Sequence, residues 1–245
     1  MISRIKCIIE YDGTPYVGFQ IQPNGLSVQE VLENTLTNIF GQSVRVSSAS
    51  RTDAGVHAHG QVIIFDVTTG IPAERICRVA NDNLPADIRI LKSEQVPANF
   101  HPRYDARGKT YRYIIYRKLE GSAFWHPRAW IYRLPLDLDR MQAAAAKLVG
   151  TYDMSCFCAS GSTVKNRVRT IQECSWLEEG AICTLTVTGS GFLYHQVRNM
   201  VGTMTEIGRG VWEPEYIDWL LTSGDRNQAG PTAPAAGLYL EQVIY

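Results

Sequence analysis

The sequence predicts an α+β fold built from two split-βαβ halves, ferredoxin-like or RRM-like in element order, with mostly antiparallel sheets and a basic cleft between the halves. Two observations support this prediction. Segments with strand and helix periodicity follow one another in the order β-α-β-β-α-β, and the same order occurs twice. The length of 245 residues corresponds to between one and two domains of about 150 residues.

The first half opens with a strand and a capped helix. Residues 4–11 alternate between apolar and polar side chains, which is the period of a half-buried strand. Ser27 and Glu30 match a capping box, which predicts a helix over 28–40. Gly41 follows its apolar face and is typical of a helix end. The other elements expected in this half are strands over 44–49 and 61–67, a helix from Pro72 to residue 84, and a strand over 88–96.

The second half repeats this order with longer inserts. Residues 109–117 alternate in the same way and predict a strand. Asp137 or Asp139 can cap a helix over 141–149, which Gly150 would end. The remaining predictions are hairpin strands over 170–177 and 182–188, helices over 193–208 and 214–221, and a last strand over 238–245.

The charges are balanced overall but not locally. The 24 Lys and Arg residues equal the 24 Asp and Glu residues, which argues against a protein that binds nucleic acid through bulk charge. We expect the chain to divide near residues 99–107, into domains 1–104 and 105–245. Basic side chains cluster from this boundary onward and would line a cleft there: Arg103, Arg107, Lys109, Arg112, Arg117 and Lys118.

The sequence also suggests where the protein works. No apolar run is long enough to cross a membrane, and the first residues do not resemble an export signal. We therefore expect a cytoplasmic protein without a membrane association. In that reducing compartment the six cysteines should be buried thiols rather than disulfides.

A polar loop of the first half places an arginine, a carboxylate and two histidines close together. As a turn residue, Asp53 would hydrogen-bond its own backbone. As a catalytic group, Asp53 would be kept ionised by Arg51, as a nucleophile or general base requires. His57 and His59 would point the same way from a strand, which suits two metal ligands, but no third ligand is evident. The residue pattern alone leaves these interpretations open.

Two further segments could bind a ligand. Residues 100–117 interleave aromatic with basic side chains, a combination that can stack on RNA bases and neutralise phosphates, although most of the rings are expected in the core. Residues 189–200 run from a strand end into an apolar helix that contains Arg198. Arg198 either borders the apolar face or enters the cleft to pair with a carboxylate.

Several motifs, spread nearly from end to end, resemble a known family. They are Tyr11-Asp12-Gly13-Thr14, S-R-T-D-A-G-V-H-A over 50–58, Phe100-His101-Pro102-Arg103 leading to Lys109-Thr110-Tyr111-Arg112-Tyr113, G-S-G-F-L-Y-H-Q-V-R-N-M over 189–200, and Ala233-Pro234 with Gly237-Leu238-Tyr239. On these motifs the chain resembles the bacterial tRNA pseudouridine synthases of the TruA type.

The resemblance implies isomerisation of uridine to pseudouridine in the anticodon stem-loop of tRNA, at uridines 38–40, by a homodimer that needs no cofactor or metal. It places the catalytic loop in the first domain, and the substrate tyrosine strand and arginine helix in the second. By matching position, Asp53 is the catalytic aspartate. The resemblance also implies four substrate-binding residues. Tyr111 would stack on the target base, and Arg198 would pair with the aspartate. Arg51 would fill the space of the flipped nucleotide, and Leu193 would form part of the wall of the uracil pocket.

Two alternatives come from other classes. A non-catalytic RNA-binding module would keep the cleft, but the set of Asp53, Tyr111 and Arg198 argues against it. A metal-dependent hydrolase would use Asp53 with the two histidines and would lose activity with a chelator. Phe19 and residues 150–154 depart from the family pattern, and the second departure bears more on which uridines are modified than on the reaction.

Overall fold

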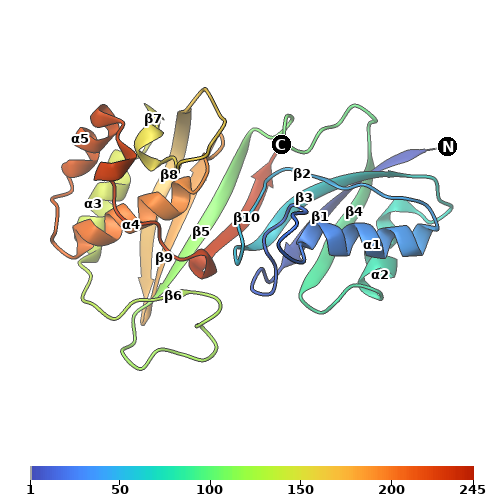
Figure 1. Cartoon of the computed structure of the whole chain (residues 1–245), viewed down its shortest axis with the longest axis horizontal. Helices are drawn as coiled ribbons and strands as arrows, with labels where there is room; N and C mark the ends of the chain where they lie inside the picture. The colour runs from blue at the N-terminus through green and yellow to red at the C-terminus, as the bar shows by residue number, and fades with distance from the viewer. Residues whose placement is uncertain (1) are drawn as a thin grey trace. The chain divides into compact units, whose positions relative to one another are not determined.

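The structure, a computed structural model, describes residues 2–245, which divide into two compact units. Unit 1 contains the residues up to Arg107 together with Tyr239–Tyr245, and unit 2 contains Gly108–Leu238. The fold is α+β, and its strands pair in a mixed, mostly antiparallel manner (Figure 1). This division differs from the sequence-based one, 1–104 and 105–245, because the last strand pairs with a strand of unit 1.

Unit 1 has a strand at its centre that pairs on both sides. β1 (Ser3–Tyr11) is antiparallel to β3 (His57–Val67) and to β4 (Ile88–Val96), and β10 (Leu238–Ile244) runs parallel to β3. Helix α1 (Val28–Phe40) buries an apolar stripe in the core. The predicted cap is confirmed, since the Ser27 side chain accepts a hydrogen bond from the N–H of Glu30, and Gly41 ends the helix with a φ of 61°.

Two other elements of unit 1 are shorter than the sequence predicts. The expected strand over 44–49 is reduced to β2 (Ser47–Ser48), because the N–H groups before it bond to side chains of α1 rather than to a strand: Val44 to Thr37 and Val46 to Glu33. The expected helix over 72–84 consists of a 3₁₀ turn (Ala73–Arg75) followed by α2 (Ile76–Asn81). β3, in contrast, begins at His57, before its predicted start at residue 61.

Unit 2 contains an antiparallel run of four strands in the order β5-β9-β8-β7. Their bounds are Gly108–Tyr116 for β5, Gly150–Asp153 for β7, Val168–Glu179 for β8 and Ile182–Gly189 for β9, and the short β6 (Trp130–Ile131) pairs with β5 in parallel. The sequence analysis missed β6 and β7. It did predict β5, β8 and β9 to within three residues at each end, because their side chains alternate.

The α-helices of unit 2 can be followed in Figure 1. They are α3 (Leu138–Lys147), which Asp137 caps, α4 (Gln196–Gly208) and α5 (Tyr216–Ser223). The Trp176 backbone N–H on β8 donates to Gln142 of α3, and its indole donates to the sulfur of Met204 on α4. Both helices therefore pack at the same strand.

Two properties concern the whole described chain. Across residues 2–245, the helices are all too short or too polar to span a bilayer. The six cysteines are free thiols, and five of them are buried as the sequence analysis expected, whereas Cys77 is half-buried.

Candidate functional site

The loop that contains Asp53 is held by the backbone of a neighbouring segment in unit 1. Phe19 donates its N–H to the carbonyl oxygen of Thr52 at 3.1 Å, and Gly18 forms an antiparallel bridge with Asp53. On the other side, the Val56 N–H donates to the Asp53 carbonyl oxygen at 3.1 Å. The backbone of Asp53 is thus fixed from both directions, while the residue keeps partial exposure to solvent.

Two glycines allow the neighbouring segment to come this close. Gly18 has a φ of 116°, and a Cβ added to it would lie 2.8 Å from the carbonyl oxygen of Thr52. A Cβ on Gly13 would lie only 2.0 Å from the carbonyl oxygen of Val56. Because a side chain at either position would displace the loop, both glycines determine where Asp53 lies.

A buried pair of hydroxyl groups connects β1 to the same loop. The Tyr11 and Thr52 hydroxyl oxygens are 2.8 Å apart, and both residues are buried. Nearby, Tyr16 donates its hydroxyl to Asp87 at 2.8 Å. Burial raises the pKa of Tyr16, and the hydrogen bond to Asp87 raises it further, so this hydroxyl stays protonated. These bonds anchor the segments on either side of the loop.

His57 is a buried residue of the core rather than an open ligand. Its ring stacks on Tyr239 with centroids 4.7 Å apart, and its Nδ1 accepts a hydrogen bond from the Gly13 N–H at 3.1 Å. A carboxylate oxygen of Asp12 lies 3.2 Å from the same Nδ1.

His59 has a different environment two residues further along β3. It is exposed, and its Nδ1 lies 3.1 Å from a carboxylate oxygen of Glu241. Within residues 2–245, no three His, Cys, Asp or Glu side chains are grouped so that they could hold a metal ion. Arg51, the other charged residue of the predicted set in unit 1, is exposed.

Tyr111 lies on β5 of unit 2, directly opposite Val187 on β9. It is 7% exposed, and its ring makes an edge-to-face contact with Phe192 at a centroid distance of 5.0 Å. Such a contact holds an aromatic ring in a defined orientation. The alternation of side chains predicted strand β5. It could not predict the ring contact with Phe192, because that contact depends on the turn after β9.

The turn between β9 and α4 contains a residue in the left-handed region. His195 has φ 58° and ψ 9° and directly precedes Gln196, the first residue of α4. This conformation is uncommon outside glycine and stores backbone strain. Leu193 is buried, and its N–H donates to the Gln196 side-chain oxygen at 2.8 Å. The turn therefore fixes Leu193 against the start of the helix.

Arg198 lies in the first turn of α4, because the helix begins at Gln196 and not at residue 193, where the sequence predicted its start. Its Nε donates to the carbonyl oxygen of Ala233 at 2.7 Å, and the Ala233 N–H donates back to the Arg198 carbonyl oxygen at 3.2 Å. Burial raises the pKa of Tyr113 well above its usual range, and the charge of Arg198 opposes this shift. Two hydrogen bonds thus tie Arg198 to the segment before β10.

The structure places the five predicted residues in two sets. Asp53 and Arg51 share one loop of unit 1, while Tyr111, Leu193 and Arg198 lie in unit 2. The sequence analysis missed the groups that hold them, such as the Tyr11 and Thr52 hydroxyls and the Ala233 carbonyl. The only feature of the sequence that could have pointed to these groups is that each residue lies within or beside one of the family motifs.

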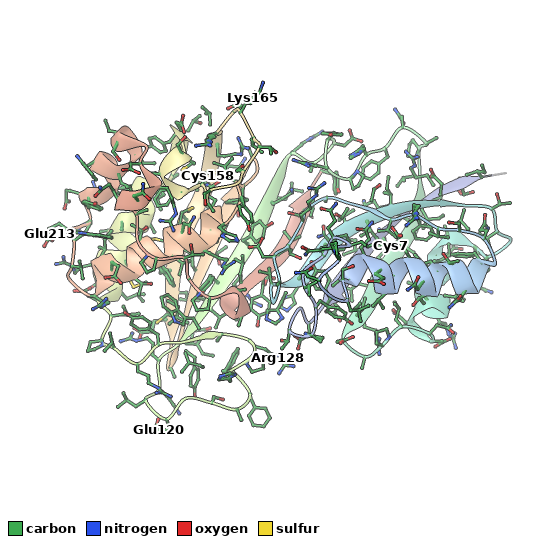
Figure 2. All side chains as sticks on the ribbon, in the orientation of Figure 1. Cys7, Glu120, Arg128, Cys158, Lys165 and Glu213 are labelled. Carbon is green, nitrogen blue, oxygen red and sulfur yellow. The ribbon has the colours of Figure 1, made fainter. Side chains whose placement is uncertain are left out.

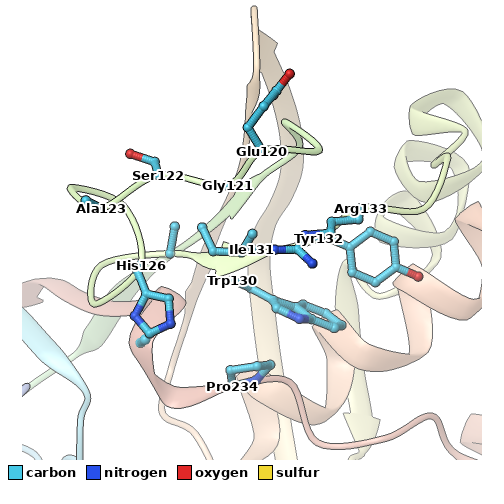
Figure 3. A pocket seen from close by; sticks show the side chains of 12 residues that line it. Glu120, Gly121, Ser122, Ala123, His126, Trp130, Ile131, Tyr132, Arg133 and Pro234 are labelled. Atoms are coloured by element: carbon cyan, nitrogen blue, oxygen red, sulfur yellow. The ribbon is translucent and has the colours of Figure 1, made fainter.

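A separate concave pocket of about 790 Å³ opens beside β6 in unit 2 (Figure 3). β6 contributes Trp130, the segments next to it contribute His126, Tyr132 and Arg133, and the segment before β10 contributes Pro234. Its lining includes none of the five predicted site residues. The pocket and the surroundings of Arg198 share the segment around Pro234.

Comparison with known proteins assigns the chain to a family. A sequence profile described as tRNA pseudouridine synthase matches residues 7–105 and 144–245. The chain therefore belongs to the tRNA pseudouridine synthase family, which confirms the resemblance seen in its motifs.

Curated relatives match over the whole chain. The tRNA pseudouridine synthase A of Exiguobacterium sibiricum is 46% identical over 244 residues, which cover 100% of this chain and 97% of that protein. The proteins of the same name from Syntrophomonas wolfei and Pelobacter propionicus are 43% and 45% identical, again over 100% of this chain and over 98% and 100% of their own lengths.

Proposed function

We propose that this protein isomerises uridine to pseudouridine in the anticodon arm of tRNA. The observation that carries the proposal is 43–46% identity, over the whole chain, to proteins named tRNA pseudouridine synthase A. In the reaction the N1–C1′ bond breaks and a C5–C1′ bond forms, so that C5 loses a proton and N1 gains one. The enzyme therefore needs a carboxylate at the sugar and a pocket that retains the detached base.

Asp53 supplies that carboxylate. Its backbone is fixed by Gly18 and Val56, and its partial exposure leaves it accessible to a substrate. The exposed Arg51, two residues earlier, takes the place of the flipped nucleotide. Extruding a nucleotide from a stack costs a few kcal/mol, and a group that fills the vacated space offsets part of that cost.

Three residues of unit 2 act on the substrate. The Tyr111 ring, oriented by Phe192, stacks on the target base, an interaction worth about 1–3 kcal/mol per base. Leu193 walls the uracil pocket, and Arg198 supplies positive charge to the reacting groups. The support for these roles is that the fold fixes each side chain locally, as the hydrogen bonds of Leu193 and Arg198 illustrate.

The proposed enzyme works as a homodimer in the cytoplasm and uses no cofactor. The reaction involves no net oxidation or reduction, so it requires no redox carrier. The basic cleft and the choice of uridines 38–40 stay predictions from the sequence. Exposed basic side chains occur in both units, with Arg103 in unit 1 and Lys165 at the tip of the loop before β8 (Figure 2).

The test is tritium release from tRNA labelled at uridine C5, in the presence of EDTA. Wild type should release tritium, and Asp53→Asn should lower the rate by at least about 10³-fold while tRNA binding persists. Asp82→Asn is the matched control, because it makes the same change at an exposed position of unit 1 and should leave the rate unchanged. Normal turnover by Asp53→Asn would refute the assignment of the carboxylate. No release by wild type would favour a non-catalytic RNA-binding module.

A further inference from the structure

Asn199, the neighbour of Arg198 on α4, is a fully buried polar residue. Its Nδ2 donates to the carbonyl oxygen of Phe157 at 2.8 Å. Its Oδ1 accepts two hydrogen bonds, from the Arg226 guanidinium at 2.9 Å and from the Thr232 hydroxyl at 2.6 Å. The Arg226 guanidinium also donates to the Thr232 hydroxyl at 3.1 Å, so the three side chains form a closed triangle.

The same triangle fixes residues 226–234, called here the strap, along α4. The Gly230 N–H of the strap donates to the Thr203 hydroxyl at 2.9 Å, and this hydroxyl donates to the Asn199 carbonyl oxygen at 2.8 Å. The contact is also one of backbone against backbone, since a Cβ on Gly202 would lie 1.7 Å from the carbonyl oxygen of Pro231. The strap therefore has one position on the helix.

The strap leads directly to the group that holds Arg198. Thr232 precedes Ala233, whose carbonyl oxygen accepts from the Arg198 Nε and whose N–H donates to the Arg198 carbonyl oxygen. The next carbonyl, that of Pro234, accepts from the Tyr113 hydroxyl at 2.8 Å. A hydrogen bond at Nε sets the direction in which the rest of the planar guanidinium points.

We infer that Asn199, Thr232 and Arg226 are positioning residues that hold the Arg198 guanidinium in its working orientation. The inference rests on the proposed function, in which Arg198 acts on the substrate. The side chains of the three residues bond to one another, and the strap that they hold binds Arg198 through Ala233. The Arg226 guanidinium bonds here to neutral oxygen atoms, and burial lowers its pKa, which fits a structural rather than an ion-pairing role.

The test removes one hydroxyl from the network. Thr232→Val keeps the volume but loses both hydrogen bonds of the Thr232 side chain, so Ala233 is less well fixed. We expect kcat for tritium release to fall about 3- to 10-fold, with no change in the Kd for tRNA, because the loss of the two hydrogen bonds reaches Arg198 only in part. Thr232→Ser restores the hydroxyl and should restore kcat.

The matched control is Thr205→Val, which removes a buried hydroxyl of α4 that bonds to the Val201 carbonyl oxygen at 2.8 Å and not to the strap. It should lose similar stability and keep kcat. In an Arg198→Lys background, which keeps the charge but has no Nε, Thr232→Val should have no further effect.

Three results separate the possible failures. An inactive wild type would refute the proposed function and not merely the network. With an active wild type, an unchanged kcat in Thr232→Val would overturn the positioning role. Two other outcomes would assign the network to stability alone. One is that Thr232→Val lowers kcat equally in the wild-type and Arg198→Lys backgrounds. The other is that Thr205→Val lowers kcat as much as Thr232→Val does.

Discussion

The two units hold their proposed functional groups by different means. In unit 1, the Asp53 loop rests against the backbone of residues 13–19, and the fit depends on glycines that bring two backbones together. In unit 2, a triangle of polar side chains around Asn199 fixes the strap that binds Arg198. Backbone contacts tolerate changes of neighbouring side chains but no added Cβ, whereas a side-chain network is weakened by the loss of a single hydroxyl.

The largest effects should come from adding a Cβ where the backbones touch. Gly13→Ala in unit 1 would place a Cβ 2.0 Å from the Val56 carbonyl oxygen, and Gly202→Ala in unit 2 would place one 1.7 Å from the Pro231 carbonyl oxygen. In both variants the backbone must move. Each should lower the free energy of unfolding by about 3 kcal/mol, measured by urea denaturation. Gly70→Ala, where nothing lies within 4 Å, is the control and should stay within about 0.5 kcal/mol of wild type. Wild-type stability in both site variants would contradict the close packing.

A smaller effect should distinguish anchoring of the loop from general stability. Tyr11→Phe removes the hydroxyl bonded to Thr52 and leaves a buried oxygen with one partner fewer, at a cost of about 1–2 kcal/mol. Because Thr52 precedes Asp53, kcat for tritium release should fall as well. Tyr245→Phe, which removes a hydroxyl bonded to the Pro102 carbonyl oxygen at 2.8 Å, should lose stability but keep kcat. Equal kcat values in the two variants would separate the Tyr11 hydroxyl from catalysis.

Contacts between exposed basic residues and RNA should have a further, salt-dependent effect. Arg103→Gln in unit 1 and Lys165→Gln in unit 2 each remove one exposed charge. If each contacts a phosphate, tRNA binding weakens and the slope of log K against log salt becomes shallower by about 0.7–0.9. Arg75→Gln changes the net charge equally, at an exposed position of the 3₁₀ turn before α2, and should leave the slope unchanged. A slope that does not change would remove the tested residue from the RNA contact.

The sequence predicted those elements whose determinants are local. Helix α1 begins and ends where Ser27 and Gly41 indicated, because a cap involves only residues of one turn. The strand expected over 44–49 was wrong in length, because Thr37 and Glu33 of α1 compete for its backbone N–H groups. That competition depends on how the helix packs, and no periodicity reports it.

The same distinction applies to the candidate site. Asp53 could be singled out because R-T-D-A-G-V-H-A combines chemically active side chains in a short run. The part played by Ala233 could not, since a backbone carbonyl has no residue-specific signal and meets Arg198 from 35 positions away. Asn199 and Thr232 are likewise ordinary polar residues until the fold brings their side chains together.

The smallest effect concerns an ion pair at the surface of unit 1, where Asp66 lies 2.7 Å from Arg4. Hydrogen bonding by Arg4, aided by its charge, holds the pKa of Asp66 below its usual value. A carboxyl whose pKa is lower in the folded state stabilises the fold above its unfolded pKa, and that stabilisation is lost as pH falls through the folded pKa. Asp66→Asn should therefore lower the free energy of unfolding at neutral pH, by no more than about 1 kcal/mol because the pair is partly exposed. In urea denaturation, the gap between Asp66→Asn and wild type should close as the pH is lowered into the acid range. A gap that stayed constant across this pH range would show that Asp66 acts through its packing and not through its charge.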